Sequence, residues 1–186
     1  MAHPMKLTRD GSTLVVVDVQ ERLFAAMDAE HREEVVKNLK VLAAAARRLG
    51  LPILVTEQYP KGLGHTLPEL REALGAIEPL EKVTFSCCDV EEFTTRLKAA
   101  KTKQVILAGI ETHVCVLMTA LDLLGAGYTV HVAADAVTSR TQGSWRIGVE
   151  HLRQAGAVIT TTESVLFQLL HKADTDDFRA LTKLIK

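Results

Sequence analysis

The segment TLVVVDV, residues 13–19, decides the fold class of this chain. Its apolar run is typical of a strand that is buried on both faces of a parallel sheet. Comparable segments follow at residues 52–57 (PILVTE), 104–109 (QVILAG), 128–135 (YTVHVAAD) and 157–163 (AVITTTE), with a short extended segment at 81–86 (EKVTFS). Helical repeats separate them, and this alternation predicts a parallel sheet. We expect an α/β fold, a Rossmann-like three-layer sandwich with a central parallel sheet and helices on both faces.

The helices are predicted from apolar spacing and from residues that begin or end a helix. Apolar residues recur at helical spacing from Asp28 onward, and Gly50 is placed to end that helix. Asp89 precedes Glu92 by three residues, the spacing of a capping box, which predicts that a helix begins there. Further helices are expected over residues 112–127, 145–156, 164–173 and 175–186, and a proline- and glycine-containing loop over 57–70, with a short helix from Pro68.

Length and composition exclude several classes of protein. The 186 residues, 47% of them hydrophobic, suit one domain over residues 1–186. A net charge of −1 and 4% aromatic residues provide neither a basic face nor a stacking platform for nucleic acid. The longest aliphatic run, VLAAAA at residues 41–46, is too short for a membrane span, and the first residues lack a signal-peptide core. We expect a cytoplasmic protein with reduced thiols.

Functional side chains are expected where strands end, because ligands bind beyond the carboxyl ends of parallel strands. The candidates at these positions are Asp18, Glu57, Gln58, Lys82, residues 109–115 and Asp135.

Cys115 is a candidate nucleophile. It lies in the first turn of the helix predicted after QVILAG, where unpaired backbone N–H groups and the helix dipole favour a thiolate. The alternative is that Cys115 is a small apolar residue buried in the core. His113 lies two residues earlier, and such positions on a helix do not face each other. His113 is therefore expected to contact substrate or solvent, and the base must come from elsewhere.

Asp18 and Lys82 are candidates to activate the thiol. Asp18 follows the most buried predicted strand, where burial raises the pKa of a carboxyl unless a cation compensates. Such a carboxylate could accept the thiol proton, and Lys82 would supply the cation. Alternatively, Asp18 caps a helix or braces a loop, and Lys82 is a surface charge.

Three motifs in order, VVVDVQ (15–20), EKVTFS (81–86) and GIETHVCV (109–116), resemble the isochorismatase-like cysteine hydrolase superfamily. The segments at 56–64, 120–140 and 153–170 look like the subgroup of isochorismatase domain-containing proteins. The resemblance implies a catalytic triad of Asp18, Lys82 and Cys115. Asp18 would take the thiol proton, Lys82 would orient and polarise that pair, and the sulfur would attack a carbonyl carbon to form a thioester.

The resemblance also implies an oxyanion hole. Family members have a non-proline cis peptide that here would join Ile110 to Glu111. The backbone N–H groups of Glu111 and Cys115 would then stabilise the developing oxyanion.

Departures from the family pattern narrow the chemistry. Nicotinamidases carry a histidine cluster after the second strand, whereas this region contains only His65, so we expect no catalytic metal, no cofactor and no preference for nicotinamide. Cys115 favours hydrolysis of a C–N or acyl bond over the vinyl ether hydrolysis of isochorismatases, which stays an alternative. A catalytically idle binding or assembly module is another. A nucleotide-binding Rossmann protein is disfavoured, because VDVQERL contains no glycine.

The expected partner is a small-molecule substrate. The side chains placed near the mouth of the site, each of which could equally be packing or bracing, are Gln20, Phe24, Gln58, Tyr59, Phe85 and His113. Family members commonly self-associate, so we expect a homo-oligomer. The apolar C-terminal helices, with Leu166, Phe167, Leu169 and Leu170, could supply a subunit face or pack on their own sheet.

Overall fold

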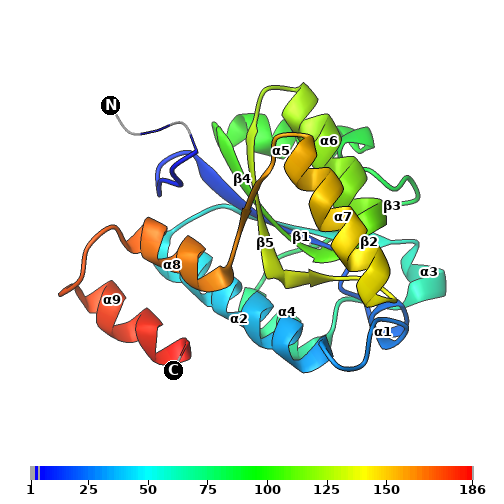
Figure 1. Ribbon diagram of the computed structural model, residues 1–186, viewed down its shortest axis with the longest axis horizontal. Coiled ribbons are helices and arrows are strands. Elements are labelled where there is room, and N and C mark those ends of the chain that lie inside the picture. The colour runs from blue at the N-terminus through cyan, green and yellow to red at the C-terminus, as the bar shows by residue number, and fades with distance from the viewer. Residues whose placement is uncertain (1–2, 4, 186) are drawn as a thin grey trace.

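A parallel sheet forms the centre of the protein (Figure 1). The computed structural model describes residues 3 and 5–185, and within them the sheet has six strands in the order β3-β2-β1-β4-β5-β6. The strands are β1 (Ser12–Val17), β2 (Ile53–Gln58), β3 (Leu80–Lys82), β4 (Gln104–Ile110), β5 (Thr129–Thr138) and β6 (Val158–Thr160). After β1, the chain adds β2 and then β3 on one side of it. The chain then crosses back to place β4 on the other side of β1, followed by β5 and β6. The predicted α/β fold is confirmed.

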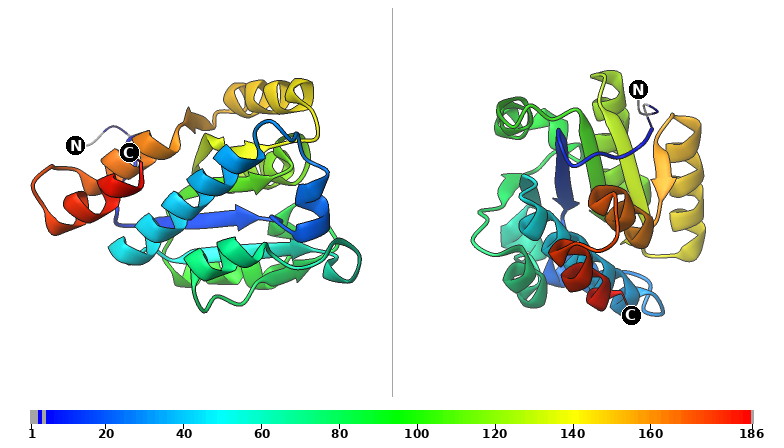
Figure 2. Two further views of the ribbon diagram at one scale, coloured as in Figure 1. Left: turned by 90° about the horizontal axis from the view of Figure 1, so that it is seen from below. Right: turned by 90° about the vertical axis from the view of Figure 1, so that its left-hand side faces the viewer.

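Helices cover both faces of this sheet (Figures 1 and 2). One layer contains α2 (Arg32–Leu49), α4 (Pro68–Leu74), α8 (Thr162–Leu170) and α9 (Asp176–Leu181). The other contains α5 (Glu91–Ala99), α6 (Leu117–Gly125) and α7 (Gln142–Gln154). Short helices are α1 (Glu21–Ala25) and α3 (Pro60–Leu63), with 3-10 turns at Cys87–Asp89 and Thr182–Leu184 and a π turn at Thr112–Val116. Among the described residues, no helix is both long and apolar enough to cross a bilayer.

The central strand β1 divides the core in two because its side chains alternate between the faces of the sheet. Leu14 and Val16 pack with the layer that contains α2, whereas Val15 and Val17 pack with the layer that contains α6. Every residue of β1 is buried, as its apolar run predicts.

The close pairing of β1 with β4 brings the ends of both strands together. Val17 lies opposite Thr56 of β2 on one side and Gly109 of β4 on the other. Gly109 has φ of +116°, and a Cβ atom there would overlap the carbonyl oxygen of Val17. Only glycine fits this contact, which places the residues after β1 beside those after β4.

Several element boundaries differ from the predictions. Helix α2 begins at Arg32, because the Asp28 side chain accepts from Glu30 N (3.3 Å) in a turn that precedes it. The capping box at Asp89 is wrong. Asp89 ends a 3-10 turn in which Ser86 accepts from Cys88 N, and α5 starts after Val90 without a side-chain cap.

The C-terminal helix α8 packs mainly on its own sheet. Leu166, Leu169 and Leu170 are buried in the core beside α2. Phe167 is 42% exposed, and its ring centroid lies 6.2 Å from that of Phe178 in α9. Of the apolar residues proposed for a subunit face, three are therefore used within the chain.

Candidate active site

Asp18 follows β1 directly and turns the chain at the carboxyl edge of the sheet. Its φ is +52°, a left-handed conformation that aspartate tolerates better than most residues. Its backbone N–H donates to Thr56 O at 3.1 Å, which extends the pairing of β1 with β2 by one residue. The carboxyl is thus held at the end of the most buried strand, with no side-chain exposure.

Lys82, the last residue of β3, reaches Asp18 across the end of β2. Its Nζ lies 2.6 Å from Asp18 Oδ2, and both side chains are 0% exposed. The ammonium also donates to Gln58 Oε1 (2.6 Å) and to the carbonyl oxygens of Thr84 and Phe85 (both 3.1 Å). A buried charge pair is tolerable when further hydrogen bonds replace its hydration, as these oxygens do for Lys82.

The pKa values of the pair show how burial and attraction compete. Burial raises the pKa of Asp18, and Lys82 opposes this rise without cancelling it. Burial works to lower the pKa of Lys82, but the neighbouring Asp18 and Cys115 raise it above its ordinary value. Lys82 therefore stays an ammonium at neutral pH, while the basicity of Asp18 moves toward that of a general base.

Cys115 lies in the π turn Thr112–Val116, which follows β4. The turn closes through Val116 N, which donates to Glu111 O at 3.2 Å. The thiol is near the Asp18 carboxyl, and their interaction contributes to the pKa shifts of both groups. Asp18 Oδ2 lies 2.6 Å from Lys82 Nζ, so the carboxylate that the thiol approaches is already paired with a cation.

The resting sulfur is a neutral thiol, and the expectation that the helix start would favour a thiolate is wrong here. Burial first, and then the charge of Asp18, raise the pKa of Cys115 to about 12, outweighing the opposite effect of Lys82. Cys115 is 5% exposed, so little water reaches the sulfur. The arrangement can form a nucleophile only if the proton moves to Asp18 as the sulfur attacks.

Glu111 and His113 precede Cys115 in the chain and have partners on the segment after β5. His113 Nδ1 lies 3.0 Å from Ser139 Oγ. Arg140 Nη2 donates to Glu111 Oε1 and Arg140 Nε to Oε2, both at 3.0 Å. The Ile110–Glu111 peptide bond is cis, as the resemblance implies. The role of the Glu111 and Cys115 N–H groups as an oxyanion hole stays a prediction.

Sequence reasoning missed Ser139 and Arg140. They follow Thr138, the last residue of β5, and the predicted strand stopped three residues earlier. The same strand-end argument would have found both residues if the strand had been extended. Asp135, which the shorter strand placed at its end, instead accepts from Thr162 N (2.8 Å) at the start of α8.

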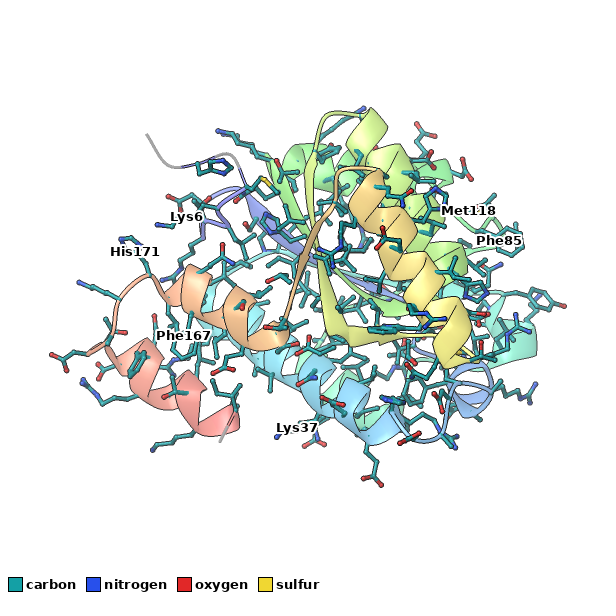
Figure 3. The ribbon with its side chains drawn as sticks, viewed as in Figure 1. Lys6, Lys37, Phe85, Met118, Phe167 and His171 are labelled. Atoms are coloured by element: carbon teal, nitrogen blue, oxygen red, sulfur yellow. The ribbon has the colours of Figure 1, made fainter. Side chains whose placement is uncertain are left out.

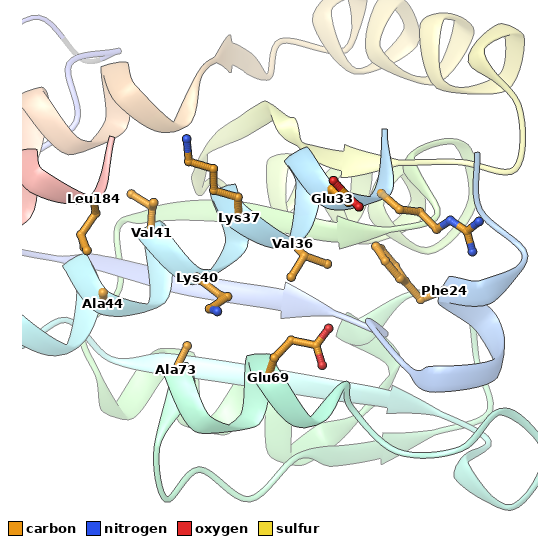
Figure 4. A pocket seen from close by; sticks show the side chains of 11 residues that line it. Phe24, Glu33, Val36, Lys37, Lys40, Val41, Ala44, Glu69, Ala73 and Leu184 are labelled. Carbon is orange, nitrogen blue, oxygen red and sulfur yellow. The ribbon is translucent and has the colours of Figure 1, made fainter. Parts of the chain in front are cut away.

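Two of the proposed substrate contacts, Gln20 and Phe24, have bracing or packing partners within the chain, and their contact with substrate stays a prediction. Gln20 is buried, and its amide donates to the carbonyl oxygens of Gln58 (2.9 Å) and Gly64 (2.7 Å) while accepting from Gln58 N (2.7 Å). Phe24 packs in the core beside α2 and lines a groove of about 680 Å³ on that side (Figure 4). Leu184 lies at the other end of this groove, which has no triad residue in its lining.

The remaining candidates lie near the carboxyl edge. Gln58 bridges the site, because it accepts from Lys82 and donates to Val83 O at 2.9 Å. Tyr59 and Phe85 are 54% and 53% exposed, and Phe85 lies beside Met118 of α6 (Figure 3). Contact of these side chains and of His113 with substrate stays a prediction.

In the loop where we expect no metal site, both oxygens of the Glu57 carboxylate have partners within the chain. Glu57 accepts from Thr66 N and Thr66 Oγ1, both at 2.7 Å, and its second oxygen lies 3.0 Å from His65 Nδ1. Within residues 3 and 5–185, no three His, Cys, Asp or Glu side chains are grouped so that they could hold a metal ion. Cys87, Cys88 and Cys115 are free thiols.

Comparison with known proteins identifies the family. The model of the isochorismatase domain matches residues 12–164. Isochorismatase domain-containing protein 2 of Danio rerio is 40% identical over 186 residues, covering 100% of this chain and 92% of the relative. The chain belongs to the isochorismatase domain family.

Two solved structures are similar over nearly the whole chain. The MAR1 ribonuclease of Caenorhabditis elegans is 41% identical with a TM-score of 0.90, covering 97% of this chain and 92% of that one. The YcaC gene product of Escherichia coli, described as an octameric hydrolase of unknown specificity, is 25% identical with a TM-score of 0.90, covering 96% and 90%. A hydrolase is thus among the solved structures with this fold.

Proposed function

We propose that this protein is a cysteine hydrolase of a small amide, carbamoyl or related acyl substrate, with Asp18, Lys82 and Cys115 as its catalytic residues. One observation carries the proposal. A wholly buried ion pair, with Asp18 Oδ2 2.6 Å from Lys82 Nζ, lies beside a buried thiol at the carboxyl edge of the sheet. Perturbed titratable groups with a specific charge partner at such an edge are typical of catalytic sites.

The reaction follows from the protonation states. Cys115 transfers its proton to Asp18 as the sulfur bonds to the substrate carbonyl carbon, and the N–H groups of Glu111 and Cys115 donate to the oxyanion. When the C–N bond breaks, Asp18 returns the proton to the leaving nitrogen, and a thioester remains. Asp18 then takes a proton from the attacking water, and the thiolate that leaves the collapsing thioester recovers this proton, which restores the thiol.

Lys82 has an electrostatic task in this cycle. Its charge opposes the effect of burial, so Asp18 is available as a carboxylate before each proton transfer. With its ammonium directed at Asp18, Gln58 and two backbone oxygens, Lys82 has no free N–H for substrate. Recognition of the substrate is therefore assigned to other side chains, with Tyr59 and Phe85 as the first candidates.

A homo-oligomer is part of the proposal. The octameric hydrolase from Escherichia coli has the same fold over 96% of this chain. Exposed apolar side chains near the site, including Val83, Phe85 and Met118, would be available to a second subunit.

Mass spectrometry of the intact protein tests the chemistry. Incubation with a panel of amides, ureas and carbamoyl compounds should give an acyl adduct on the wild-type chain and none on Cys115→Ala. Cys88→Ala is the matched control, because Cys88 is a half-buried free thiol outside the triad, and it should keep the adduct. An adduct that survives in Cys115→Ala would contradict the assignment of the nucleophile.

Ribonuclease activity is a second candidate because the Caenorhabditis elegans neighbour bears that name. Phosphate backbones bind to unpaired cations, yet Lys82 and Arg140 near the nucleophile are already paired with Asp18 and Glu111. Cleavage of a single-stranded RNA oligonucleotide by the wild type, lost in Cys115→Ala, would favour this second activity over amide hydrolysis.

A further inference from the structure

A third side chain, Thr56 of β2, contacts the Asp18 carboxylate. It binds Oδ1, whereas Lys82 faces Oδ2. Thr56 Oγ1 donates to Asp18 Oδ1 at 2.7 Å, and neither residue is exposed. Thr56 reaches this position because it pairs with Val17, the residue before Asp18, in the parallel ladder. The two carboxylate oxygens therefore have different surroundings.

The thiol of Cys87 lies behind Thr56. Cys87 Sγ is 3.7 Å from Thr56 Oγ1, and the residue is fully buried. The Cys87 backbone N–H donates to Thr119 Oγ1 at 3.0 Å, which fixes the 3-10 turn against α6. Cys87 thus has a defined place beside the site, although the reaction does not use it.

The directions of these hydrogen bonds follow from chemistry. An ionised carboxylate only accepts hydrogen bonds, so Thr56 must donate its single hydroxyl proton to Asp18. The Thr56 oxygen can then act toward Cys87 only as an acceptor. Burial raises the pKa of Cys87 to about 11, so its thiol keeps the proton that it donates.

We propose that Cys87 and Thr56 form a hydrogen-bond relay that positions Asp18 for the proposed hydrolysis, and the inference rests on that function. Thr56 binds Oδ1 and Lys82 pairs with Oδ2, so the carboxylate is held in one orientation toward the proton of Cys115. Cys87 fixes the rotation of the Thr56 hydroxyl. Both are positioning residues, because they act through Asp18 and do not touch substrate.

The relay has a measurable effect on the basicity of Asp18. The ionisable groups that face Asp18 are Lys82 from β3, Cys115 from the π turn and Cys87 from the 3-10 turn. The hydrogen bond from Thr56 lowers the pKa of Asp18 against the effect of burial. Without that bond, Asp18 would stay protonated to higher pH and could not act as a base there.

The test measures acylation of Cys115 by p-nitrophenyl acetate as a function of pH, followed by nitrophenolate release and intact mass. In Thr56→Val, the acid limb of the profile should move up by about one pH unit, the worth of one charge-assisted hydrogen bond. Thr56→Ser keeps a hydroxyl and should restore the wild-type profile, which a merely structural role does not predict.

Thr13→Val is the matched control. Thr13 is a buried threonine of β1 whose hydroxyl lies 2.7 Å from that of Thr102, with no contact to Asp18. Its loss should change stability and leave the acid limb in place. If Thr56→Val does not fold, Cys87→Ala decides, with a smaller upward movement of the limb expected, and Cys87→Ser as the variant that keeps a donor.

The possible failures are distinguishable. A wild-type chain that p-nitrophenyl acetate does not acylate at Cys115 would overturn the proposed function and the relay with it. A wild-type chain that is acylated, together with folded Thr56→Val or Cys87→Ala whose acid limbs coincide with that of the wild type, would overturn the relay alone.

Discussion

Replacing Asp18 with asparagine should make Cys115 more reactive toward alkylation while it abolishes hydrolysis. The pKa of Cys115 is raised from 9.0 to about 12, so at neutral pH its thiolate is about a thousandfold scarcer than that of an ordinary thiol. The charge of Asp18 is the second cause of this rise after burial, and Lys82 acts in the opposite direction. In Asp18→Asn, Lys82 faces the thiol alone, and we expect a pKa at least about one unit lower, or about tenfold more thiolate.

The assay is the rate of iodoacetamide modification of Cys115 at neutral pH, read by intact mass and assigned by peptide mapping. Lys82→Met is the opposing control, because loss of the cation should slow modification below the wild-type rate. Hydrolysis should fall in both variants, since one lacks the base and the other the charge that keeps the base ionised. A modification rate in Asp18→Asn equal to or below that of the wild type would show that the aspartate charge does not act on the sulfur.

Three further predictions concern the supports of the site. His131 is fully buried, with neither ring nitrogen bonded within the described part of the chain, and burial lowers its pKa to about 4. In the unfolded chain the imidazole has its ordinary pKa of about 6.5, so as the pH falls it is protonated there before it is protonated in the folded chain. The free energy of unfolding should therefore keep its full value above about pH 6.5 and fall by about 3 kcal/mol as the pH drops through 4. Urea unfolding should show a smaller fall for His131→Leu. Gly109→Ala should lower the midpoint of thermal unfolding strongly, since the added methyl group meets the Val17 carbonyl. Gly125→Ala should not lower it, because the space around Gly125 is open. Equal midpoints for the two variants would contradict this account. Arg140→Leu removes the cation from the buried Glu111 carboxylate, which keeps only the backbone N–H of residue 140 (3.3 Å), and should reduce turnover at least about tenfold with iodoacetamide access to Cys115 retained. Unchanged turnover would remove Arg140 from the site.

The sequence predicts the sheet well because long apolar runs and helical repeats are strong signals. The strand-end argument places Asp18, Lys82 and the segment that contains Cys115 among a wider set of candidates, because the carboxyl ends of parallel strands share one edge. The resemblance to the family then implies these three residues as the triad. The capping box at Asp89 fails since Ser86 caps an earlier turn, and sequence spacing alone does not rank two competing caps.

Contacts that depend on register lie beyond the reach of the sequence. Thr56 meets Asp18 only because Val17 pairs with Thr56 and not with a neighbouring residue. The pKa of Cys115 is equally inaccessible, since it depends on how completely the folded chain excludes water from the sulfur. Helix position predicts a lowered pKa, and burial reverses that outcome.

The separation between the buried ion pair and the exposed aromatic rim has an evolutionary consequence. Asp18 and Lys82 are sealed from solvent, while Tyr59 and Phe85, which follow β2 and β3, stand more than half exposed. Under the proposed function, substitutions at Tyr59 and Phe85 would change which molecules enter the site and leave the buried Asp18–Lys82 pair unchanged. A protein built in this way would change its substrates during evolution through substitutions at exposed positions, while the buried reactive residues stay the same.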